Sequence, residues 1–313
     1  MLLNQKTRYK YFSLIIKILI GLGALGFILV KLKHGFHNNI SSINNSGINY
    51  GYIFMALTLM LFNWGIETYK WNFLIKKIVE LSFFKAFKIV ITGITISLIT
   101  PNRIGEIPGR VYLLNRKSRN RDLIWLTTMG SFTQLVCTVL FGGIGLMFTY
   151  EYFHSYLSSK MLIVLFTTFL LITLLFFAIP FFARKIKSLK KLLSEKALQV
   201  SGVDILQVQL ISVLRYFIFF FQYLLILWAF NINVFEIEEI MLIPVCFFVA
   251  SIIPTILLSE IGVRSSVAIF IFGMVSDNTM AIVLSSVVLW TINIALPGLL
   301  GILNLNQLKI FNR

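Results

Sequence analysis

Long apolar runs separated by short polar segments dominate the sequence. Six of them are long enough to cross about 30 Å of hydrocarbon. This pattern predicts an all-α, polytopic membrane protein, because a helix satisfies its own backbone hydrogen bonds inside lipid. The chain is expected to form a single integral membrane domain over 1–313. The six expected spans are 12–31, 51–69, 123–149, 161–182, 206–230 and 280–303.

Two further apolar stretches, near 84–100 and 240–275, are interrupted and do not look like simple spans. The first has basic flanks on both sides, whereas acidic residues flank the second. Because basic flanks favour the cytoplasm, each stretch is expected to enter and leave the membrane on one side. The sequence therefore predicts two inverted re-entrant helical hairpins, the first open to the cytoplasm and the second to the outside.

Composition and charge agree with a membrane protein. Hydrophobic residues make up 58% of the chain and charged residues 13%, whereas a soluble domain carries about 25% charged residues. The net charge of +16 first indicates positively charged cytoplasmic loops, with both termini in the cytoplasm. It only secondarily suggests an anionic partner, and no nucleic-acid partner is expected.

The two interrupted stretches are similar to each other. They read SLITPNRIGEIPGR at 97–110 and SIIPTILLSEIGVR at 251–264, and both end in Glu-Ile-x-x-Arg. Their flanking spans run in opposite directions, which predicts an inverted repeat over roughly 51–149 and 206–303. Transporters built in this way bind substrate near the midplane, between broken helices.

The repeated charges are the strongest candidates for function, because a charge at the membrane centre costs about 2.5–3.5 kcal/mol. Glu-x-x-x-Arg spacing places both groups on one face of a helix. The pair could simply stabilise its own hairpin, or it could line a cavity for an anion such as a lipid phosphate. Two copies favour the second interpretation. The predicted head-group site comprises Arg103, Glu106, Arg110, Arg215, Glu260 and Arg264.

Other charged positions have simpler interpretations. Arg215 could equally snorkel toward the cytoplasmic end of its span, and Glu67 is expected to form a surface ion pair with Lys70. Prolines and glycines should break the two hairpins and free helix N-termini to face an anion. Pro108 suits the first turn of the second half-helix, and the glycines allow tight turns and close backbone approach. The expected hairpin-breaking residues are Pro101, Gly105, Pro108, Gly109, Pro254 and Gly262.

Several other kinds of chemistry are disfavoured. Cys137 and Cys246 both lie in apolar runs, which excludes a disulfide framework. The three histidines have no cluster of ligands around them, so neither a metal nor another cofactor is expected. The basic segment 184–205 should begin as an amphipathic helix on the cytoplasmic membrane surface. It is expected to set orientation rather than bind a specific lipid.

The segment TPNRIGEIPGR, a basic loop and a later EIGVR together resemble the lysylphosphatidylglycerol synthase transmembrane region family, over nearly the whole chain. The resemblance implies a multi-pass protein of the bacterial inner membrane, flippase-like, that moves aminoacylated or glycosylated anionic lipids between leaflets. In many members an acid follows the arginine of the second motif, whereas here Ser265 follows Arg264. No hydrophilic stretch could form the aminoacyl-transferase domain of some relatives, so synthesis of lysyl-lipid is not expected.

The expected function is therefore translocation of an anionic or modified phospholipid, or of a polyprenyl-linked lipid, without catalysis. One alternative is a membrane-embedded transferase or phosphatase that acts on a lipid phosphate, with Glu106 or Glu260 as base. Another is a non-catalytic membrane subunit that recruits a lipid-modifying enzyme through the basic segment.

Overall fold

The structure is a computed structural model, and it describes residues 47–98, 100, 103–114, 120–155, 194–255 and 257–305, with isolated positions at 26 and 30, between 158 and 173, and at 185 and 186. Every regular element in these ranges is a helix, which confirms the all-α prediction. The elements are α2 (Tyr50–Ile75), α3 (Phe83–Leu98), α4 (Glu106–Leu113), α5 (Asn120–Phe148), α6 (Tyr150–Phe153), α9 (Glu195–Leu198), α10 (Gly202–Ala229), α11 (Ile237–Ile240), α12 (Leu242–Ile252), α13 (Leu257–Phe272), α14 (Thr279–Trp290), the π-helical turn η3 (Thr291–Ala295) and α15 (Leu296–Leu305).

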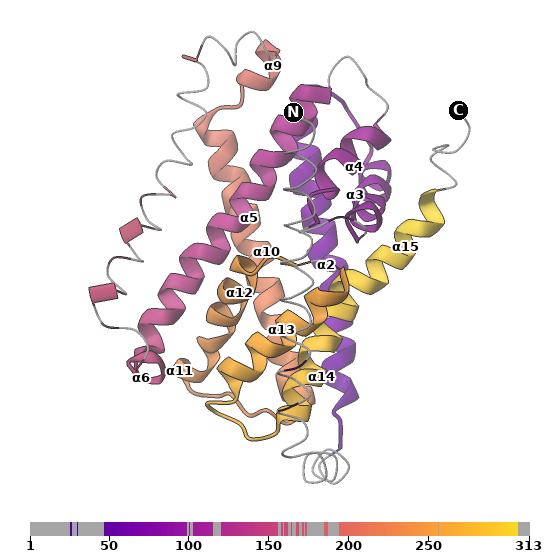
Figure 1. Cartoon of the computed structure of the whole chain (residues 1–313). Coiled ribbons are helices and arrows are strands. Elements are labelled where there is room, and N and C mark those ends of the chain that lie inside the picture. The colour runs from indigo at the N-terminus through magenta and orange to yellow at the C-terminus, as the bar shows by residue number, and fades with distance from the viewer. Residues whose placement is uncertain are drawn as a thin grey trace, which may run out of the picture.

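Four long helical units run the length of the molecule (Figure 1). They are α2, α5, α10 and the continuous unit of α14, η3 and α15. In Figure 1, α5 and α10 run downward from the top, whereas α2 and the last unit run upward. Among them, α2 packs along α10. The shorter helix α12 packs along α5, and the shorter helix α3 packs along α15. These four units coincide with four of the six predicted spans.

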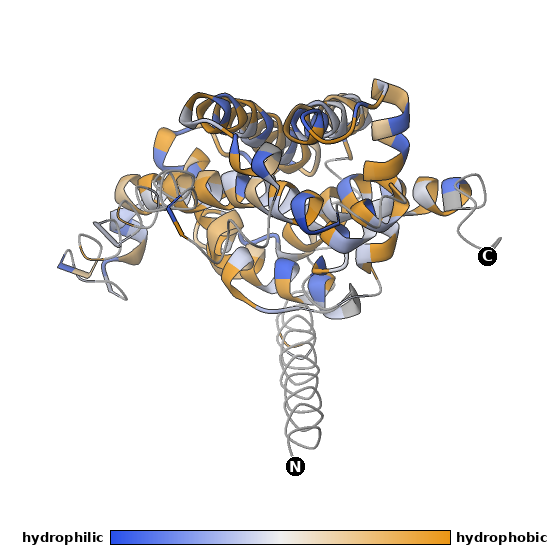
Figure 2. Ribbon diagram, turned by 90° about the horizontal axis from the view of Figure 1, so that it is seen from above, coloured by the Kyte–Doolittle hydropathy of each residue, from blue (hydrophilic) through white to orange (hydrophobic). Residues whose placement is uncertain are grey.

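Three helices of the described chain are long and apolar enough to cross a membrane: Asn120–Phe148, Gly202–Ala229 and Thr279–Asn304. Large apolar side chains such as Phe54 and Leu210 face outward on the long helices, and Figure 2 shows apolar residues over much of the bundle. This exposed apolar surface is that of a membrane protein. The predicted spans 12–31 and 161–182 lie mostly outside the described residues, so the six-span count stays a prediction.

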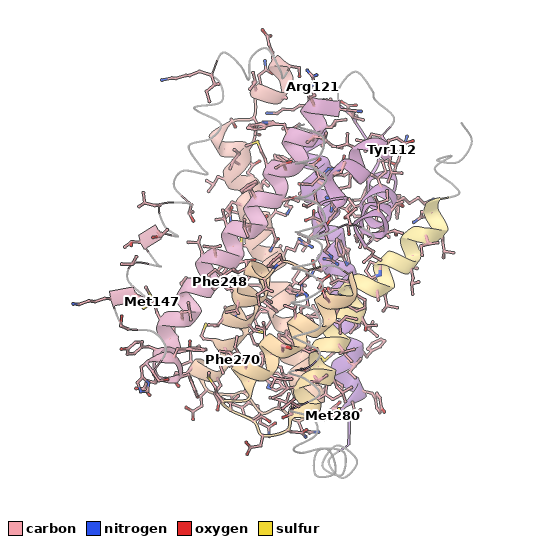
Figure 3. All side chains as sticks on the ribbon, viewed as in Figure 1. Tyr112, Arg121, Met147, Phe248, Phe270 and Met280 are labelled. Carbon is pink, nitrogen blue, oxygen red and sulfur yellow. The ribbon has the colours of Figure 1, made fainter. Side chains whose placement is uncertain are left out.

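Each interrupted stretch forms two helices separated by a break. Helices α3 and α4 are separated by residues 99–105, and α12 and α13 by residues 253–256. The two helical pairs lie toward opposite ends of the bundle: Figure 3 places Tyr112 of α4 near the end that holds Arg121, and Phe270 of α13 near the end that holds Met280. Of the predicted segment 184–205, the described helical part consists of α9 and the start of α10.

Three of the expected hairpin-breaking residues do not lie in the breaks. Gly262 is inside α13, while Pro108 and Gly109 are inside α4. Pro108 fits there because the first turn of a helix needs no backbone N–H donor. Gly109 instead allows α3 to approach, since a Cβ at this position would lie 3.2 Å from Cβ of Ile96.

The other expected breaking residues have different outcomes. Pro254 lies between α12 and α13, and Pro101 is outside the described residues. Gly105 lies immediately before α4 with an ordinary helical φ of −64°. Gly105 leaves room for the side chain of Thr100, because a Cβ at position 105 would lie 2.6 Å from Thr100 Cγ2. The residue with left-handed backbone in this break is Arg103, at φ 56°.

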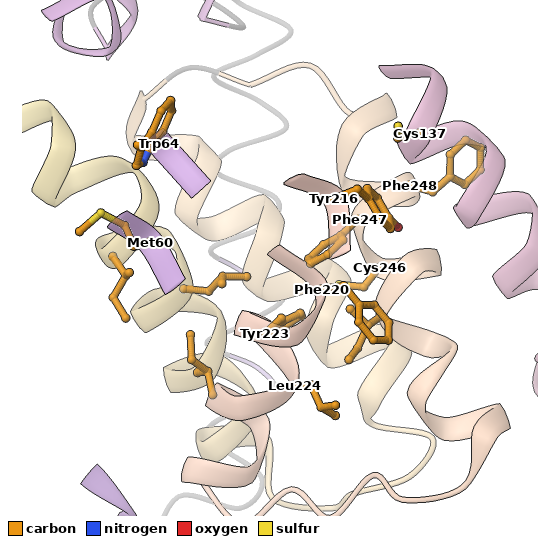
Figure 4. Close-up of a cluster of buried hydrophobic side chains, with 14 of the residues drawn as sticks. Met60, Trp64, Cys137, Tyr216, Phe220, Tyr223, Leu224, Cys246, Phe247 and Phe248 are labelled. Atoms are coloured by element: carbon orange, nitrogen blue, oxygen red, sulfur yellow. The ribbon is translucent and has the colours of Figure 1, made fainter. Parts of the chain in front are cut away.

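The core between α10, α12 and α13 is aromatic. Tyr223 stacks on Phe247 with ring centroids 5.6 Å apart, and the edge of Phe272 meets the Tyr223 ring at the same distance. Figure 4 shows Tyr216, Phe220, Tyr223 and Phe247 gathered in this layer. The buried cysteines are free thiols. This layer fixes α12 and α13 against α10, and so positions the charged residues described next.

Candidate functional site

Glu67 of α2 is the centre of one network of ion pairs, here called the Glu67 cluster. Its Oε1 lies 2.9 Å from Arg110 Nη1 of α4. Its Oε2 lies 2.9 Å from Lys70 Nζ and 3.2 Å from Arg215 Nη1 of α10. Arg110 also pairs with Glu106 one turn earlier in α4. One carboxylate thus connects α2, α4 and α10.

The expectation of a surface ion pair between Glu67 and Lys70 is wrong. Glu67 is 7% exposed and Lys70 is 1% exposed, because this side of α2 packs against α10. Lys70 Nζ also lies 3.3 Å from Ser212 Oγ of α10, to which it donates. Asn63, Glu67 and Lys70 follow one another at spacings of four and three residues, so they form a buried polar stripe on one helix face.

Arg110 is held deep in the structure, with only 2% of its surface exposed. Its side chain passes over Gly93 of α3, where an added Cβ would lie 2.7 Å from Arg110 Cγ. The guanidinium lies over the ring of Trp71, 5.7 Å from the centroid. Gly93 therefore provides the space through which Arg110 reaches Glu67.

Arg215 does not snorkel toward a membrane surface. It is the fourteenth of the 28 residues of α10, which begins at Gly202, and its Nε donates to Asn63 Oδ1 at 2.7 Å. Its Nη1 donates to Gln134 Oε1 of α5 at 3.3 Å. The guanidinium also lies 5.2 Å from the ring centroid of Trp64. Arg215 therefore joins α2, α5 and α10 at the middle of the bundle.

A second network, the Glu260 cluster, joins the two broken helical pairs. Glu260 Oε1 lies 3.0 Å from Arg264 Nη2 within α13, and Glu260 Oε2 lies 3.5 Å from Arg103 Nε. Arg103 comes from the break between α3 and α4, where its positive φ is unusual for a residue with a side chain. Strained backbone of this kind costs about 1–3 kcal/mol and concentrates at functional sites.

A cavity of about 210 Å³ lies between these two clusters. Three arginines, Arg103, Arg215 and Arg264, line it, together with aromatic and uncharged polar side chains. Of the six residues predicted for the site, these three face the cavity, whereas Glu106, Arg110 and Glu260 are not among its described lining residues. The other lining residues are Asn63, Trp64, Gln134, Thr138, Tyr216, Phe219, Phe247, Ser251, Asn293 and Ile294.

The cavity lies at the middle of all four long helical units. Trp64 is the fifteenth of the 26 residues of α2, and Gln134 is the fifteenth of 29 in α5. Arg215 occupies the equivalent place in α10, and Asn293 is fifteenth of the 26 residues of Thr279–Asn304. At 1.5 Å per residue, each is about 20 Å from the start of its helix.

The two clusters contain more positive than negative charge. The Glu67 cluster has three cations and two carboxylates, and the Glu260 cluster has two cations and one carboxylate. Each cluster therefore has a formal charge of +1. In a site shielded from water, an excess of this kind favours an anionic guest. Within the described ranges, no group of His, Cys, Asp and Glu is arranged to hold a metal ion.

Sequence reasoning missed Asn63, Gln134 and Asn293, and it assigned Glu67 to the surface instead of the site. All four are polar residues inside long apolar helices. Their position in these apolar runs could have identified them as candidates for the site. The repeated Glu-x-x-x-Arg motif was identified, and both intrahelical pairs exist. The motif did not reveal that Arg110 also reaches Glu67, or that Glu260 also reaches Arg103.

The sequence matches one family, described as Lysylphosphatidylglycerol synthase TM region, over residues 14–301. The match covers nearly the whole chain and confirms the resemblance seen in the two motifs. No curated protein and no solved structure matches the chain.

Proposed function

We propose that this chain, which belongs to the lysylphosphatidylglycerol synthase TM region family, binds anionic lipids by their phosphate and moves them between membrane leaflets. The family points to a lipid-related function in a membrane. The observation that carries the proposal is the cavity lined by Arg103, Arg215 and Arg264 at the middle of the four long helical units. Lipid translocation requires such a polar site, because a head group must cross the hydrocarbon.

Arginine suits this task because its planar guanidinium makes two parallel hydrogen bonds to a phosphate. The cavity volume is below the 300–1,000 Å³ typical of pockets that enclose a whole drug-sized ligand. It therefore fits a head group, with the acyl or prenyl chains remaining in the surrounding lipid.

The ion pairs allow the guest to exchange places with a carboxylate. Arg103–Glu260, at 3.5 Å, and Arg215–Glu67, at 3.2 Å, are the longest pairs of the two clusters. A phosphate that takes Arg103 leaves Glu260 paired with Arg264. One that takes Arg215 leaves Glu67 paired with its two nearer cations, so no buried charge loses its last partner.

The two broken helical pairs supply the route. We interpret α3–α4 as a hairpin that enters from the cytoplasm and α12–α13 as one that enters from outside, within an inverted repeat. Both termini would then be cytoplasmic, in the inner membrane of a bacterium. The first hairpin supplies Arg103 to the cavity and the second supplies Arg264, so movement of either hairpin would open the site to one leaflet.

No specific observation favours the two alternative functions. A transferase or phosphatase would need Glu106 or Glu260 as a base, but each is paired with the arginine one turn later in its own helix. Neither is among the described residues that line the cavity. A docking role would use the basic helix expected at 184–196, of which residues 184 and 187–193 lie outside the described ranges.

Leaflet exchange in liposomes tests the proposal. Purified protein is reconstituted with fluorescent phosphatidylglycerol or phosphatidylethanolamine, and the fraction reached by a membrane-impermeant quencher is followed over time. We expect the protein to accelerate exchange of phosphatidylglycerol, and Arg215→Ala combined with Arg264→Ala to abolish the acceleration. Arg121→Ala, which removes an exposed cation at the end of the bundle, is the matched control. Equal exchange by the double variant and the wild type would refute the proposal.

A further inference from the structure

Asn293 carries a hydrogen-bond acceptor that no described residue uses. Its Nδ2 donates to the carbonyl oxygen of Leu289 at 3.1 Å, which fixes the orientation of the amide because a carbonyl oxygen can only accept. The remaining Oδ1 is buried without a hydrogen-bond partner, in a residue that is 5% exposed. A buried acceptor of this kind calls for a donor that the described chain does not supply.

The backbone at this point is also unusual. Asn293 lies in η3, where the long last helix widens into a π-helical turn at its middle. Such turns are rare and occur frequently at functional sites. Asn293 and Arg264 both line the 210 Å³ cavity and both line a neighbouring cavity of about 20 Å³. Asn293, which carries the unpaired acceptor, and Arg264, one of the proposed phosphate-binding cations, therefore line the same two cavities.

The remaining polar groups of the cavity are uncharged. They are amides and hydroxyls, whereas the charged groups are the three arginines, and none of the described lining residues is a carboxylate. An ammonium group on the guest would meet repulsion from the arginines, and the nearby carboxylates of Glu67 and Glu260 are already paired with those arginines. Hydroxyl groups would meet both donors and acceptors. The uncharged lining residues with an amide or hydroxyl group are Asn63, Gln134, Thr138, Tyr216, Ser251 and Asn293.

We infer that the cavity selects a lipid phosphate esterified to an uncharged polyol, such as glycerol or a sugar, and that Asn293 Oδ1 accepts a hydrogen bond from one of its hydroxyls. This inference rests on the proposed function and deepens it by naming the class of head group. The net positive charge that attracts the phosphate disfavours cationic aminoacyl head groups.

Binding of defined lipids to the detergent-purified full chain, measured by native mass spectrometry, tests the inference. We expect phosphatidylglycerol to bind about three- to tenfold more tightly than phosphatidylmethanol, a phosphodiester of the same charge without head-group hydroxyls, the gain from one or two neutral hydrogen bonds. Lysylphosphatidylglycerol should bind more weakly than phosphatidylglycerol. A second arm compares undecaprenyl phosphate with its hexose ester, and it distinguishes a sugar on a polyprenyl carrier from a glycerophospholipid.

Two variants and a matched control locate the hydroxyl site. Asn293→Leu should remove the preference for phosphatidylglycerol over phosphatidylmethanol while leaving binding of phosphatidylmethanol unchanged. Asn293→Asp keeps the shape and adds a negative charge, so it should shift the preference toward lysylphosphatidylglycerol. If the leucine variant does not fold, this shift alone tests the role of Asn293. Asn304→Leu is the control, because Asn304 donates to Leu300 in the same way but does not line the cavity.

The outcomes separate this inference from the proposed function. If wild-type protein binds phosphatidylmethanol as tightly as phosphatidylglycerol, or binds lysylphosphatidylglycerol more tightly than phosphatidylglycerol, the polyol inference fails and the phosphate site stands. The same holds if neither variant changes any preference. If no anionic lipid binds more tightly than phosphatidylethanolamine, the proposed function itself fails.

Discussion

Replacing Glu67 with glutamine should be among the most damaging single changes in this protein. The carboxylate holds Arg110, Lys70 and Arg215 at 2.9, 2.9 and 3.2 Å, and it is nearly inaccessible to solvent. Glutamine keeps the shape but leaves three cations, of which Lys70 and Arg110 are buried, with Glu106 as their one remaining carboxylate. Breaking a buried ion pair from one side costs about 3–5 kcal/mol, so Glu67→Gln should lower the free energy of unfolding by about that amount.

A second substitution should recover much of the loss. Lys70→Met removes one of the cations that Glu67→Gln leaves unpaired, and methionine preserves most of the side-chain volume. The double variant should therefore be more stable than Glu67→Gln alone, with a coupling free energy of about 2–3 kcal/mol, as for residues that share a network. Anionic lipid should also stabilise Glu67→Gln more than the wild type, because its phosphate can replace the missing carboxylate.

Denaturant unfolding in detergent, followed by tryptophan fluorescence, measures these differences. Trp64 and Trp71 lie beside the cluster and report on it directly. Glu151→Gln, at an exposed position in α6, removes the same charge and should change stability by less than about 0.5 kcal/mol. A loss below about 1 kcal/mol in Glu67→Gln, or no recovery in the double variant, would show that the carboxylate does not hold the three cations together.

Three further predictions concern the breaks and the topology. Gly93→Ala should displace Arg110 and cost about 1–3 kcal/mol in denaturant unfolding, the usual range for overpacking. Arg103→Gly should relieve backbone strain and raise stability relative to Arg103→Ala by about 1 kcal/mol, while both variants lose affinity for anionic lipid in a thermal-shift assay. A cysteine at Arg121 should be labelled by impermeant maleimide only from the cytoplasm, and one at Asp277 only from outside; the reverse result would contradict the proposed orientation of both hairpins.

Local features of the fold could be predicted from the sequence because their causes are local. The interruptions near 99–105 and 253–256 follow from proline, glycine and charge inside apolar runs, and the structure has a break at each. The Glu-x-x-x-Arg pairs form because residues four apart share a helix face. Glycine was a weaker guide to the breaks: Gly109 and Gly262 lie inside helices, and at Gly109 the missing Cβ serves close packing against Ile96.

The site itself depends on contacts that sequence spacing does not give. Glu67 and Arg110 are 43 residues apart, and Arg215 and Asn63 are 152 apart. The depth of Arg215 was misjudged for a more specific reason. The apolar run begins near residue 206, but Ser201 and Asp204 form a capping box that starts α10 at Gly202. With four more residues in the helix, Arg215 lies at its middle.

Arg103 links the α3–α4 pair of helices to the α12–α13 pair. The carboxylates of α2 and α4, Glu67 and Glu106, both form ion pairs with Arg110, and neither is paired with Arg103 among the described ion pairs. Arg103 pairs instead with Glu260 of the α12–α13 pair, and its left-handed backbone is the conformation in which it does so. Strain at a residue that is not glycine persists only where surrounding contacts determine it. The ion pair between the two broken helical pairs is therefore also a mechanical connection. Under the proposed function, a phosphate that takes Arg103 from Glu260 would separate the α3–α4 pair from the α12–α13 pair.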